Sequence, residues 1–136
     1  MKIFAVDTSG QVAAAAVMEN GKLLGEYFLN HKKTHSQKLM QMIDVLMRDL
    51  EVRPQDIDIF SASSGPGSFT GLRIGITTIK AIAYAAGKPV VSVPTLDALA
   101  YNIYMAKSLV CPIMDARNNQ VYTALYKREN CVMANI

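Results

Sequence analysis

Apolar residues gather in three short runs over the first thirty positions, a pattern that predicts three β-strands. The runs are 2–6 (KIFAV), 11–18 (QVAAAAVM) and 22–29 (KLLGEYFL). Asn20 and Gly21 stand between the second and third runs. An Asn-Gly pair flanked by apolar segments is the strongest short-range signal for a tight hairpin. The second and third strands are therefore expected to pair.

Helical periodicity follows these strands and predicts a helix over about residues 35–50. Thr34 and Gln37 have the spacing of a capping box at its start. One face of this helix is apolar, and it is formed by Leu39, Met42, Ile43, Leu46 and Leu50. Met40 and Met47 extend that face to one side, so the apolar stripe is wider than packing on a sheet requires.

A second helix is predicted over about residues 70–86, and it is apolar around most of its circumference. Its polar side chains fall on one narrow ridge, formed by Arg73, Thr77, Lys80 and Tyr84. A helix with so little polar surface is expected to be buried on two sides. Gly71 and Gly75 leave room for another backbone to come close, either within the same chain or from a partner.

The remaining patterns complete a regular order of elements. A buried strand is predicted at 57–64 (IDIFSASS) and a parallel-type strand at 88–93 (KPVVSV), followed by a helix that begins near Pro94 or Thr95. Residues 108–128 have the pattern of two further strands joined at the turn DARNNQ. The predicted order is β-β-β-α-β-α-β-α followed by a strand pair, which is an α/β fold.

Composition narrows the class of protein. With 136 residues, 51% of them hydrophobic and 18% charged, the chain has the size and balance of one globular domain. Its net charge of +3 is too small to indicate nucleic-acid binding without a clustered basic face. Cys111 and Cys131 lie far apart with no metal-binding spacing, which favours a reducing compartment. Asp7 interrupts the first apolar run and no run approaches the length of a membrane span, so a cytoplasmic location is expected.

The glycine-rich segment 63–75 (SSGPGSFTGLRIG) is the first candidate for chemistry. It lacks the Gly-Lys-Ser/Thr of a Walker A loop, and Thr70 stands where a third glycine would complete a dinucleotide-binding motif. A glycine-rich turn into a helix still offers backbone N–H groups and the hydroxyls of Ser68 and Thr70 to an anion. The alternative is structural: Gly65 and Gly67 permit tight packing while Ser68 or Thr70 caps the helix.

Asp7, Thr8 and Ser9 end the first strand and form the second candidate for chemistry. A strand-end aspartate followed by hydroxyls can hold Mg²⁺ or a phosphate. A plain turn into the next strand explains the same three residues. Asp115 and Arg117, at the later turn, are likewise either functional or simply turn residues.

The two histidines do not indicate a metal site. His31 and His35 are spaced by four, as metal ligands on a helix are. Thr34 as the N-cap would place His31 outside the helix, and no acidic or thiol third ligand is near. No metal is therefore expected, and no Ser/His/Asp or Cys/His catalytic set can be assembled.

Four segments taken together resemble the TsaB family, also called YeaZ. They are AVDTS (5–9), HSQKL (35–39), GPGSFTGLRIG (65–75) and DARNNQVY (115–122), and their order and spacing agree with the family over about residues 2–128. The resemblance implies the actin-like, Hsp70-like ATPase fold, which is ribonuclease H-like, with two lobes. The lobes are then expected to divide the chain into 1–106 (N-terminal actin-like lobe), 107–128 (first strand pair of the second lobe) and 129–136 (an unassigned tail).

The resemblance also implies a function without catalysis. Members act as a scaffold or activator subunit that pairs with TsaD, is joined by the ATPase TsaE, and serves the threonylcarbamoylation of adenosine 37 of tRNA. The resemblance implies no cofactor for the chain itself. It implies that ATP or ADP binds within the complex and that tRNA contacts the chain only through the complex. TsaD-like enzymes carry a His-x-x-x-His metal pair after the second helix, and the matching residues 92–100 hold no histidine.

The family resemblance assigns the two over-wide helices to an interface with TsaD or with a second copy. The predicted interface residues are Met40, Ile43, Met47, Gly71, Arg73, Gly75 and Ile79. The alternative is that the methionines fill the protein's own core. Two enzymatic alternatives stay open: an ATP-binding enzyme of the actin-like fold that transfers a phosphoryl or carbamoyl group, and an M22-like metallopeptidase homologue. The missing histidines argue against the second.

Overall fold

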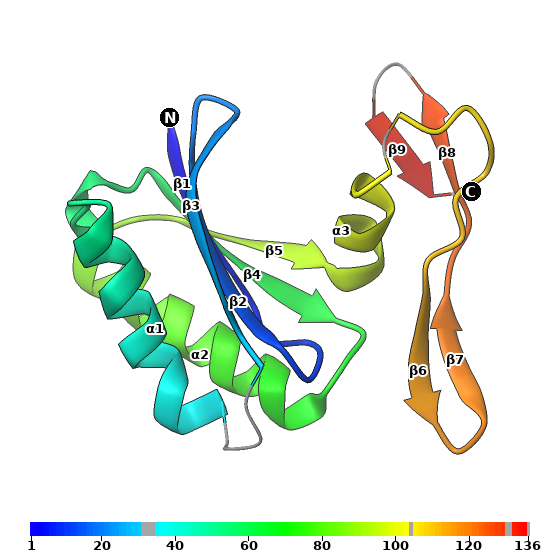
Figure 1. The fold of residues 1–136 in the computed structure, drawn as a ribbon, viewed down its shortest axis with the longest axis horizontal. Coiled ribbons are helices and arrows are strands. Elements are labelled where there is room, and N and C mark those ends of the chain that lie inside the picture. The colour runs from blue at the N-terminus through cyan, green and yellow to red at the C-terminus, as the bar shows by residue number, and fades with distance from the viewer. Residues whose placement is uncertain (31–34, 104, 130–131, 136) are drawn as a thin grey trace.

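The structure of the chain is a computed structural model that describes residues 1–30, 35–103, 105–129 and 132–135. Its centre is a five-stranded sheet with the strand order β3-β2-β1-β4-β5 (Figure 1). The strands are β1 (Lys2–Asp7), β2 (Ala13–Glu19), β3 (Lys22–Leu29), β4 (Ile59–Gly65) and β5 (Val90–Pro94). β1, β2 and β3 pair antiparallel, whereas β4 lies parallel to β1 and β5 parallel to β4.

The β2–β3 hairpin confirms the prediction made from Asn20 and Gly21. Both residues have positive φ, 51° and 80°, as a tight two-residue hairpin turn requires. Alternation along β2 sends Ala13, Ala15 and Val17 to the buried face, which explains why an alanine-rich segment still forms a strand here.

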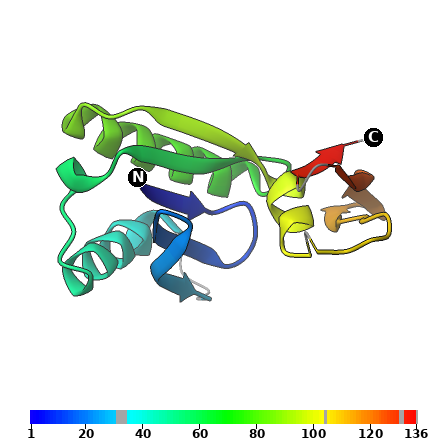
Figure 2. The same cartoon turned by 90° about the horizontal axis from the view of Figure 1, so that it is seen from above.

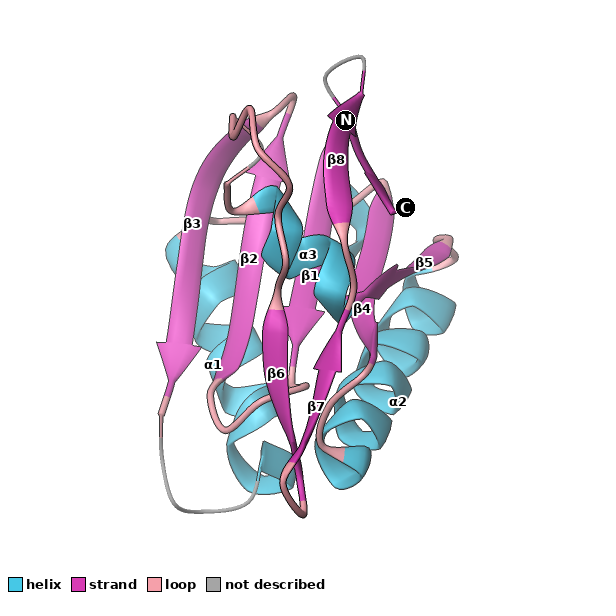
Figure 3. Ribbon diagram, turned by 90° about the vertical axis from the view of Figure 1, so that its right-hand side faces the viewer, coloured by secondary structure: helices cyan, strands magenta, loops and turns pink. Residues whose placement is uncertain are grey.

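Two long helices cover one face of the sheet, α1 (His35–Asp49) and α2 (Phe69–Ala86), as Figures 1 and 3 show. The main core lies between them and the strands. The rings of Phe4 and Phe60 pack there at a tilt of 53°, with centroids 5.8 Å apart. The predicted apolar stripe of α1 is confirmed at Leu39, Met42, Ile43 and Leu46, which are all buried. The predicted capping box at the start of α1 lies outside the described residues, because Thr34 and the Gln37 side chain are not described.

The last third of the chain gathers at one end of the sheet, as Figure 2 shows. It consists of α3 (Thr95–Tyr101), β6 (Ile113–Arg117), β7 (Gln120–Thr123), β8 (Tyr126–Glu129) and β9 (Val132–Asn135). A second, separate apolar cluster forms here around Ala100, Val110 and Tyr126. Two differences from the sequence prediction appear. The expected second strand is divided into β7 and β8, and the tail contains β9, which pairs with β8.

The division between β7 and β8 has a packing cause. Tyr126 turns inward and exchanges backbone hydrogen bonds with Val110, at 2.8 and 2.9 Å, instead of continuing the β6–β7 ladder. Its side chain is 2% exposed, which buries most of a large aromatic surface. The local sequence pattern does not indicate this pairing, because the partner, Val110, lies before β6 and outside any strand.

The turn between β6 and β7 contains three consecutive non-glycine residues with positive φ, Arg117 (66°), Asn118 (51°) and Asn119 (58°). The Arg117 backbone N–H donates to Asp115 Oδ1 at 2.7 Å, so Asp115 stabilises the turn directly. The left-handed region costs a residue with a Cβ about 1–2 kcal/mol, and asparagine is among the least penalised. The backbone geometry of the turn therefore explains Asp115 and Arg117 as turn residues. A functional role for them stays a prediction.

The asparagine turn yields a matched pair of stability predictions. Asn119→Val is expected to lower the free energy of unfolding by about 1–2 kcal/mol, since a β-branched residue is poorly accommodated at positive φ. Asn119→Gly is expected to leave it unchanged or to raise it slightly. Urea denaturation followed by circular dichroism checks both. Equal stability of the two variants would contradict the assigned turn conformation.

Candidate functional site

The structure brings the two candidate anion-binding segments together. The turn after β1, with Thr8 and Ser9, lies against the loop that enters α2. The Ser68 backbone N–H donates to the Ser9 carbonyl at 2.7 Å, and Thr8 Oγ1 donates to the Gly71 carbonyl at 2.8 Å. Residues more than fifty positions apart are thereby joined at the end of the sheet. This adjacency was expected if a nucleotide were held between the two segments.

Protein atoms fill the space directly between these segments. A Cβ added at Gly67 would lie 2.5 Å from the Ser9 carbonyl oxygen, and one at Gly71 would lie 2.1 Å from the Thr8 carbonyl oxygen. Gly65 and Gly67 have φ of 109° and 156°, which side chains rarely permit. The glycines are therefore explained by close backbone packing. Anion binding by this loop stays a prediction.

The polar side chains of the two segments also have partners within the chain. Ser68 Oγ accepts from the Gly71 backbone N–H at 3.2 Å, which confirms the predicted helix cap. Asp7 Oδ1 accepts from the Ser9 backbone N–H at 2.7 Å, the geometry of a local aspartate turn. Thr70, the other predicted cap, is exposed and lies on the outer surface of α2.

A shallow cavity of about 190 Å³ opens on the outer face of the sheet, next to Asp7. Small side chains form most of its floor, and Ala98 of α3 closes one side. The lining is mainly apolar, and its ionisable side chains are Asp7 and Glu26.

The buried face of α2 corrects one interpretation of the sequence. Gly71, Gly75 and Ile79 all point toward the sheet and are buried. A Cβ at Gly75 would lie 2.2 Å from Thr8 Oγ1. The close backbone approach expected of these glycines is confirmed at Gly71, which faces the Thr8 carbonyl, whereas Gly75 faces the Thr8 side chain; the approaching segment belongs to the same chain. These three residues do not form an outward face for a partner.

The methionines of α1 divide between core and surface. Met47 is 7% exposed and, with Ile43, belongs to the main core. For Met47 the alternative that the methionines fill the protein's own core is therefore confirmed. Met40 is 52% exposed. Of the seven predicted interface residues, Met40 and Arg73 are the two whose side chains face outward.

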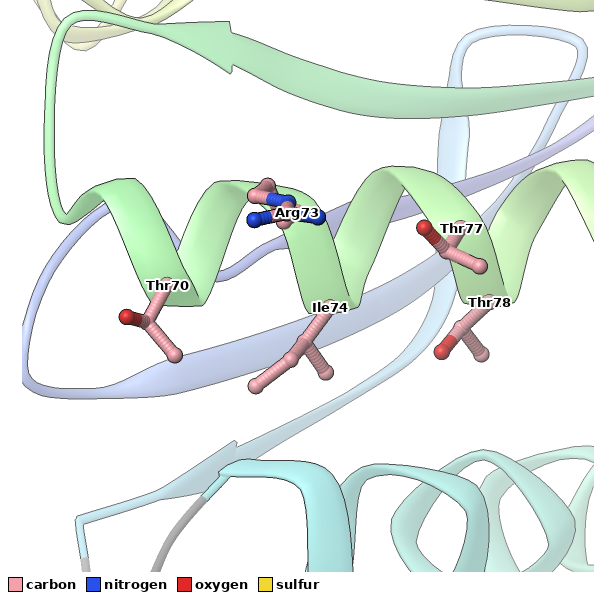
Figure 4. Close-up of a pocket in the computed structure, with 5 residues that line it drawn as sticks. All are labelled: Thr70, Arg73, Ile74, Thr77 and Thr78. Carbon is pink, nitrogen blue, oxygen red and sulfur yellow. The ribbon is translucent and has the colours of Figure 1, made fainter.

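Two hollows lie along the outer side of the α1–α2 pair, which we call the helix face (residues 38–49 and 69–82). The first has a volume of about 450 Å³ and is lined by Thr70, Arg73, Ile74, Thr77 and Thr78. Figure 4 shows Thr70, Ile74 and Thr78 on the side of α2 that faces α1. The second hollow, about 330 Å³, lies between Met40 of α1 and Ile82 of α2. The predicted polar ridge of α2 is confirmed as exposed.

An aromatic residue that the sequence interpretation did not single out lies beside the first hollow. Phe69, at the start of α2, is 74% exposed. The Arg73 guanidinium carbon lies 5.3 Å from the centre of its ring, within the range of a cation–π contact. The i, i+4 spacing of the two residues on a helix is the sequence signal that could have revealed this pair.

In the described part of the chain, no three or more histidine, cysteine, aspartate or glutamate side chains gather in a group that could hold a metal ion. His31, Cys131 and the side chain of His35 lie outside the described residues. Cys111 is exposed and unbridged. None of the helices in the described segments has the length and apolar character needed to cross a membrane.

A buried hydrogen bond links α3 to β8, and sequence pattern gave no sign of it. The Tyr126 hydroxyl donates to Asp97 Oδ1 at 2.5 Å. Burial, first, and then the Asp97 carboxylate raise the pKa of Tyr126 to about 12, because both disfavour the phenolate. The contact fastens the second apolar cluster to the end of the main sheet.

This hydrogen bond predicts a pH dependence of stability. The pKa of Tyr126 is higher in the folded than in the unfolded chain, where it is about 10. The contribution of the hydrogen bond to the free energy of unfolding is therefore complete below about pH 10 and is lost as the pH rises toward 12. Tyr126→Phe is expected to flatten the decline of thermal stability in that range. An unchanged alkaline profile in the Phe variant would contradict the assignment.

The chain matches proteins of known families over nearly its whole length. The family model of tRNA N6-adenosine threonylcarbamoyltransferase, TsaD, matches residues 22–135. The tRNA threonylcarbamoyladenosine biosynthesis protein TsaB of Bacillus subtilis is 37% identical over 136 residues, which are 100% of this chain and 59% of the relative. The chain spans 55% to 63% of the length of the curated TsaB relatives it matches.

Solved structures agree with this assignment. YeaZ from Pseudomonas aeruginosa superposes with a TM-score of 0.87 at 30% identity, covering 99% of this chain and 63% of that one. ROK hexokinase from Thermus thermophilus superposes with a TM-score of 0.58 at 14% identity, covering 98% of this chain and 49% of the kinase. The second likeness shows the fold alone, and it confirms the expected actin-like, ribonuclease H-like architecture. The chain belongs to the TsaB (YeaZ) family.

Proposed function

We propose that this chain serves the biosynthesis of threonylcarbamoyladenosine in tRNA as a non-catalytic subunit that docks on a TsaD-like catalytic subunit. The pathway is named by its TsaB relatives. Docking occurs through the helix face. The observation that carries the proposal is that this face combines the exposed Met40 and Phe69 with two hollows on the surface of the two longest helices. Exposed apolar residues around a hollow are typical of protein interaction sites.

The hydrogen bonding of the anion-binding candidates supports a structural role for them. The turn after β1 is hydrogen-bonded to the start of α2, through Ser68 to Ser9 and through Thr8 to Gly71. The Asp7 carboxylate accepts a hydrogen bond within its own turn. A catalytic phosphate site would need these donors to be available to a ligand. In the proposed function they hold α2 against β1, so the helix pair is rigid when a partner docks. ATP or ADP then belongs to the assembled complex.

The further partners follow from the same assignment. A TsaE-like ATPase joins the pair, tRNA is reached only through the complex, and the assembly works in the cytoplasm. Two copies of this chain can associate through the same helix face when the catalytic subunit is absent. Self-association and docking on the catalytic subunit are then mutually exclusive.

Light scattering coupled to size-exclusion chromatography tests the proposal. The chain is run alone, with a TsaD-like subunit, and with that subunit plus a TsaE-like ATPase, and ATP hydrolysis is measured for each sample. We expect a complex with the mass of one chain and one catalytic subunit, and no ATP hydrolysis by the chain alone. Hydrolysis by the isolated chain that disappears in Asp7→Ala would overturn the proposal in favour of an ATP-binding enzyme.

A further inference from the structure

We infer that the helix face recognises an acidic, amphipathic helix of a different protein, and that Arg73 is the residue that selects it. The inference deepens the proposed function and rests on it, because it names the chemistry of the surface that this face would bind. It starts from the charges of α1 and α2. Their distribution is uneven, and the imbalance is confined to one of the two helices.

The charges of α2 are all positive. Its eighteen residues contain Arg73 and Lys80 and no acidic side chain. Both are exposed and lie seven positions apart in the sequence, so they are on one side of the helix and about 10 Å apart along its axis. Within the described part of the chain, neither has an acidic partner.

The charges of α1 balance one another. The helix carries Lys38 and Arg48 against Asp44 and Asp49. Arg48 forms an ion pair with Asp44 one turn earlier on the same helix. Asp49 accepts a hydrogen bond from the Tyr27 hydroxyl at 3.3 Å. The two negative charges of α1 are matched by two positive charges on the same helix, so α1 brings no net negative charge to offset α2.

The segment after α1 is balanced in the same way. The short helix η1 (Pro54–Asp56) borders the second hollow, and Arg53 Nη2 lies 3.1 Å from Asp56 Oδ1. The Arg53 side-chain hydrogen bond, together with its backbone N–H, lowers the pKa of Asp56 to about 2. The carboxylate is therefore ionised and paired at neutral pH. The helix face keeps an excess of two positive charges, both on α2.

The surroundings of Arg73 suit a carboxylate. The first hollow is lined by Arg73, three threonines and Ile74. Figure 4 shows Thr77 on the same side of α2 as Arg73, whereas Thr70, Ile74 and Thr78 project toward α1. The Phe69 ring beneath the guanidinium limits its freedom, which reduces the entropy lost when a partner binds. A guanidinium binds a carboxylate through two parallel hydrogen bonds, and neighbouring hydroxyls can donate to the same group. An aspartate or glutamate on an apolar helix fits this hollow.

A second copy of the chain fits less well. Two copies that face each other through the same surface bring together two sets of Arg73 and Lys80, and the helix face of each copy carries a net positive charge. Like charges placed together across an interface are costly and act against the wrong partner. The favoured partner therefore carries carboxylates about two helical turns apart, opposite Arg73 and Lys80.

Charge reversal with a matched control tests the inference. Arg73→Glu, Arg73→Lys and Lys107→Glu are titrated against the TsaD-like subunit at low and at high ionic strength. Lys107 is exposed in the loop after α3, away from the helix face, so its reversal changes the net charge equally. At low ionic strength we expect Arg73→Glu to weaken binding by about tenfold or more and Lys107→Glu by less than about threefold. Arg73→Lys should fall between them, because it keeps the charge but loses the two parallel hydrogen bonds. Added salt should weaken the wild type more than Arg73→Glu.

The outcomes separate the two proposals. A wild-type chain that does not bind the catalytic subunit at any ionic strength would overturn the proposed function. A wild-type chain that binds, with Arg73→Glu no weaker than Lys107→Glu, would overturn this inference alone. Self-association that falls in Arg73→Glu as steeply as docking does would also overturn it, because reversing one charge should not harm contact between two positive surfaces.

Discussion

Replacing Gly75 with alanine is expected to destabilise the chain by about 2–3 kcal/mol, although the same change inside most helices stabilises by about 1 kcal/mol. The reason is Thr8, whose Oγ1 atom would lie 2.2 Å from the new Cβ. The next contacts, to Thr8 Cβ and Cγ2, would be at 3.4 Å, an ordinary separation. One atom of one side chain therefore decides the sign of the effect.

A double-mutant cycle isolates that atom. Thr8→Ala alone is expected to cost about 1 kcal/mol, since it removes the hydrogen bond to the Gly71 carbonyl. In the Thr8→Ala background, Gly75→Ala should become neutral or stabilising. Urea denaturation of the four proteins measures the coupling.

Gly71→Ala is the matched control for this cycle. Its Cβ would lie 2.1 Å from the Thr8 carbonyl oxygen, which is backbone and stays in place when the side chain is shortened. Thr8→Ala should therefore fail to rescue Gly71→Ala. Additive effects for Gly75 and Thr8, or rescue of Gly71→Ala, would contradict the packing of α2 on the turn after β1.

Met40→Asp is expected to weaken docking on the catalytic subunit by at least about 30-fold, or about 2 kcal/mol. Its side chain is exposed in the free chain, so the change should leave the free energy of unfolding nearly unchanged. In the complex, the new carboxylate would be buried without a partner beside the apolar Ile82. Calorimetric titration measures the affinity, and thermal unfolding checks the fold.

Met105→Asp is the control for this prediction. Met105 is 64% exposed and lies beyond α3, so it undergoes the same chemical change away from the helix face. It should bind as the wild type does. Met47→Asp would be uninformative about docking, because Met47 belongs to the core and its replacement would unfold the chain. Equal affinity of Met40→Asp and wild type would show that the helix face is not the docking surface.

The hydrophobic periodicity predicted where the helices and strands lie, but not which segments pack against each of them. The pattern of α2 correctly showed that Gly71 and Gly75 share a face that another segment approaches closely, through its backbone at Gly71 and through a side chain at Gly75. It did not show which backbone, because Thr8 lies 63 residues before Gly71 in the chain and nothing local links them. Similarly, spacing placed Met40 and Met47 beside one apolar stripe, but burial on folding sent Met47 into the core and left Met40 at the surface.

Other features depend on contacts that no local pattern encodes. The hydrogen bond between Asp97 and Tyr126 joins residues 29 apart, and each was unremarkable in its own segment. The strand β9 pairs with β8 in a tail whose sequence has no clear alternation. By contrast, the Asn-Gly hairpin and the Ser68 cap were predictable because each depends on a few adjacent residues.

Oxidation footprinting of the methionines tests the central claim, that the helix face is the docking surface, most directly. Met40, Met18 and Met105 are 52%, 40% and 64% exposed, so all three react in the free chain, and only Met40 lies on the helix face. Mass spectrometry of the chain with and without the TsaD-like subunit follows each conversion to the sulfoxide. We predict that the complex protects Met40 and leaves the oxidation rates of Met18 and Met105 unchanged. Protection of Met18 or Met105 with Met40 still reactive would contradict the account.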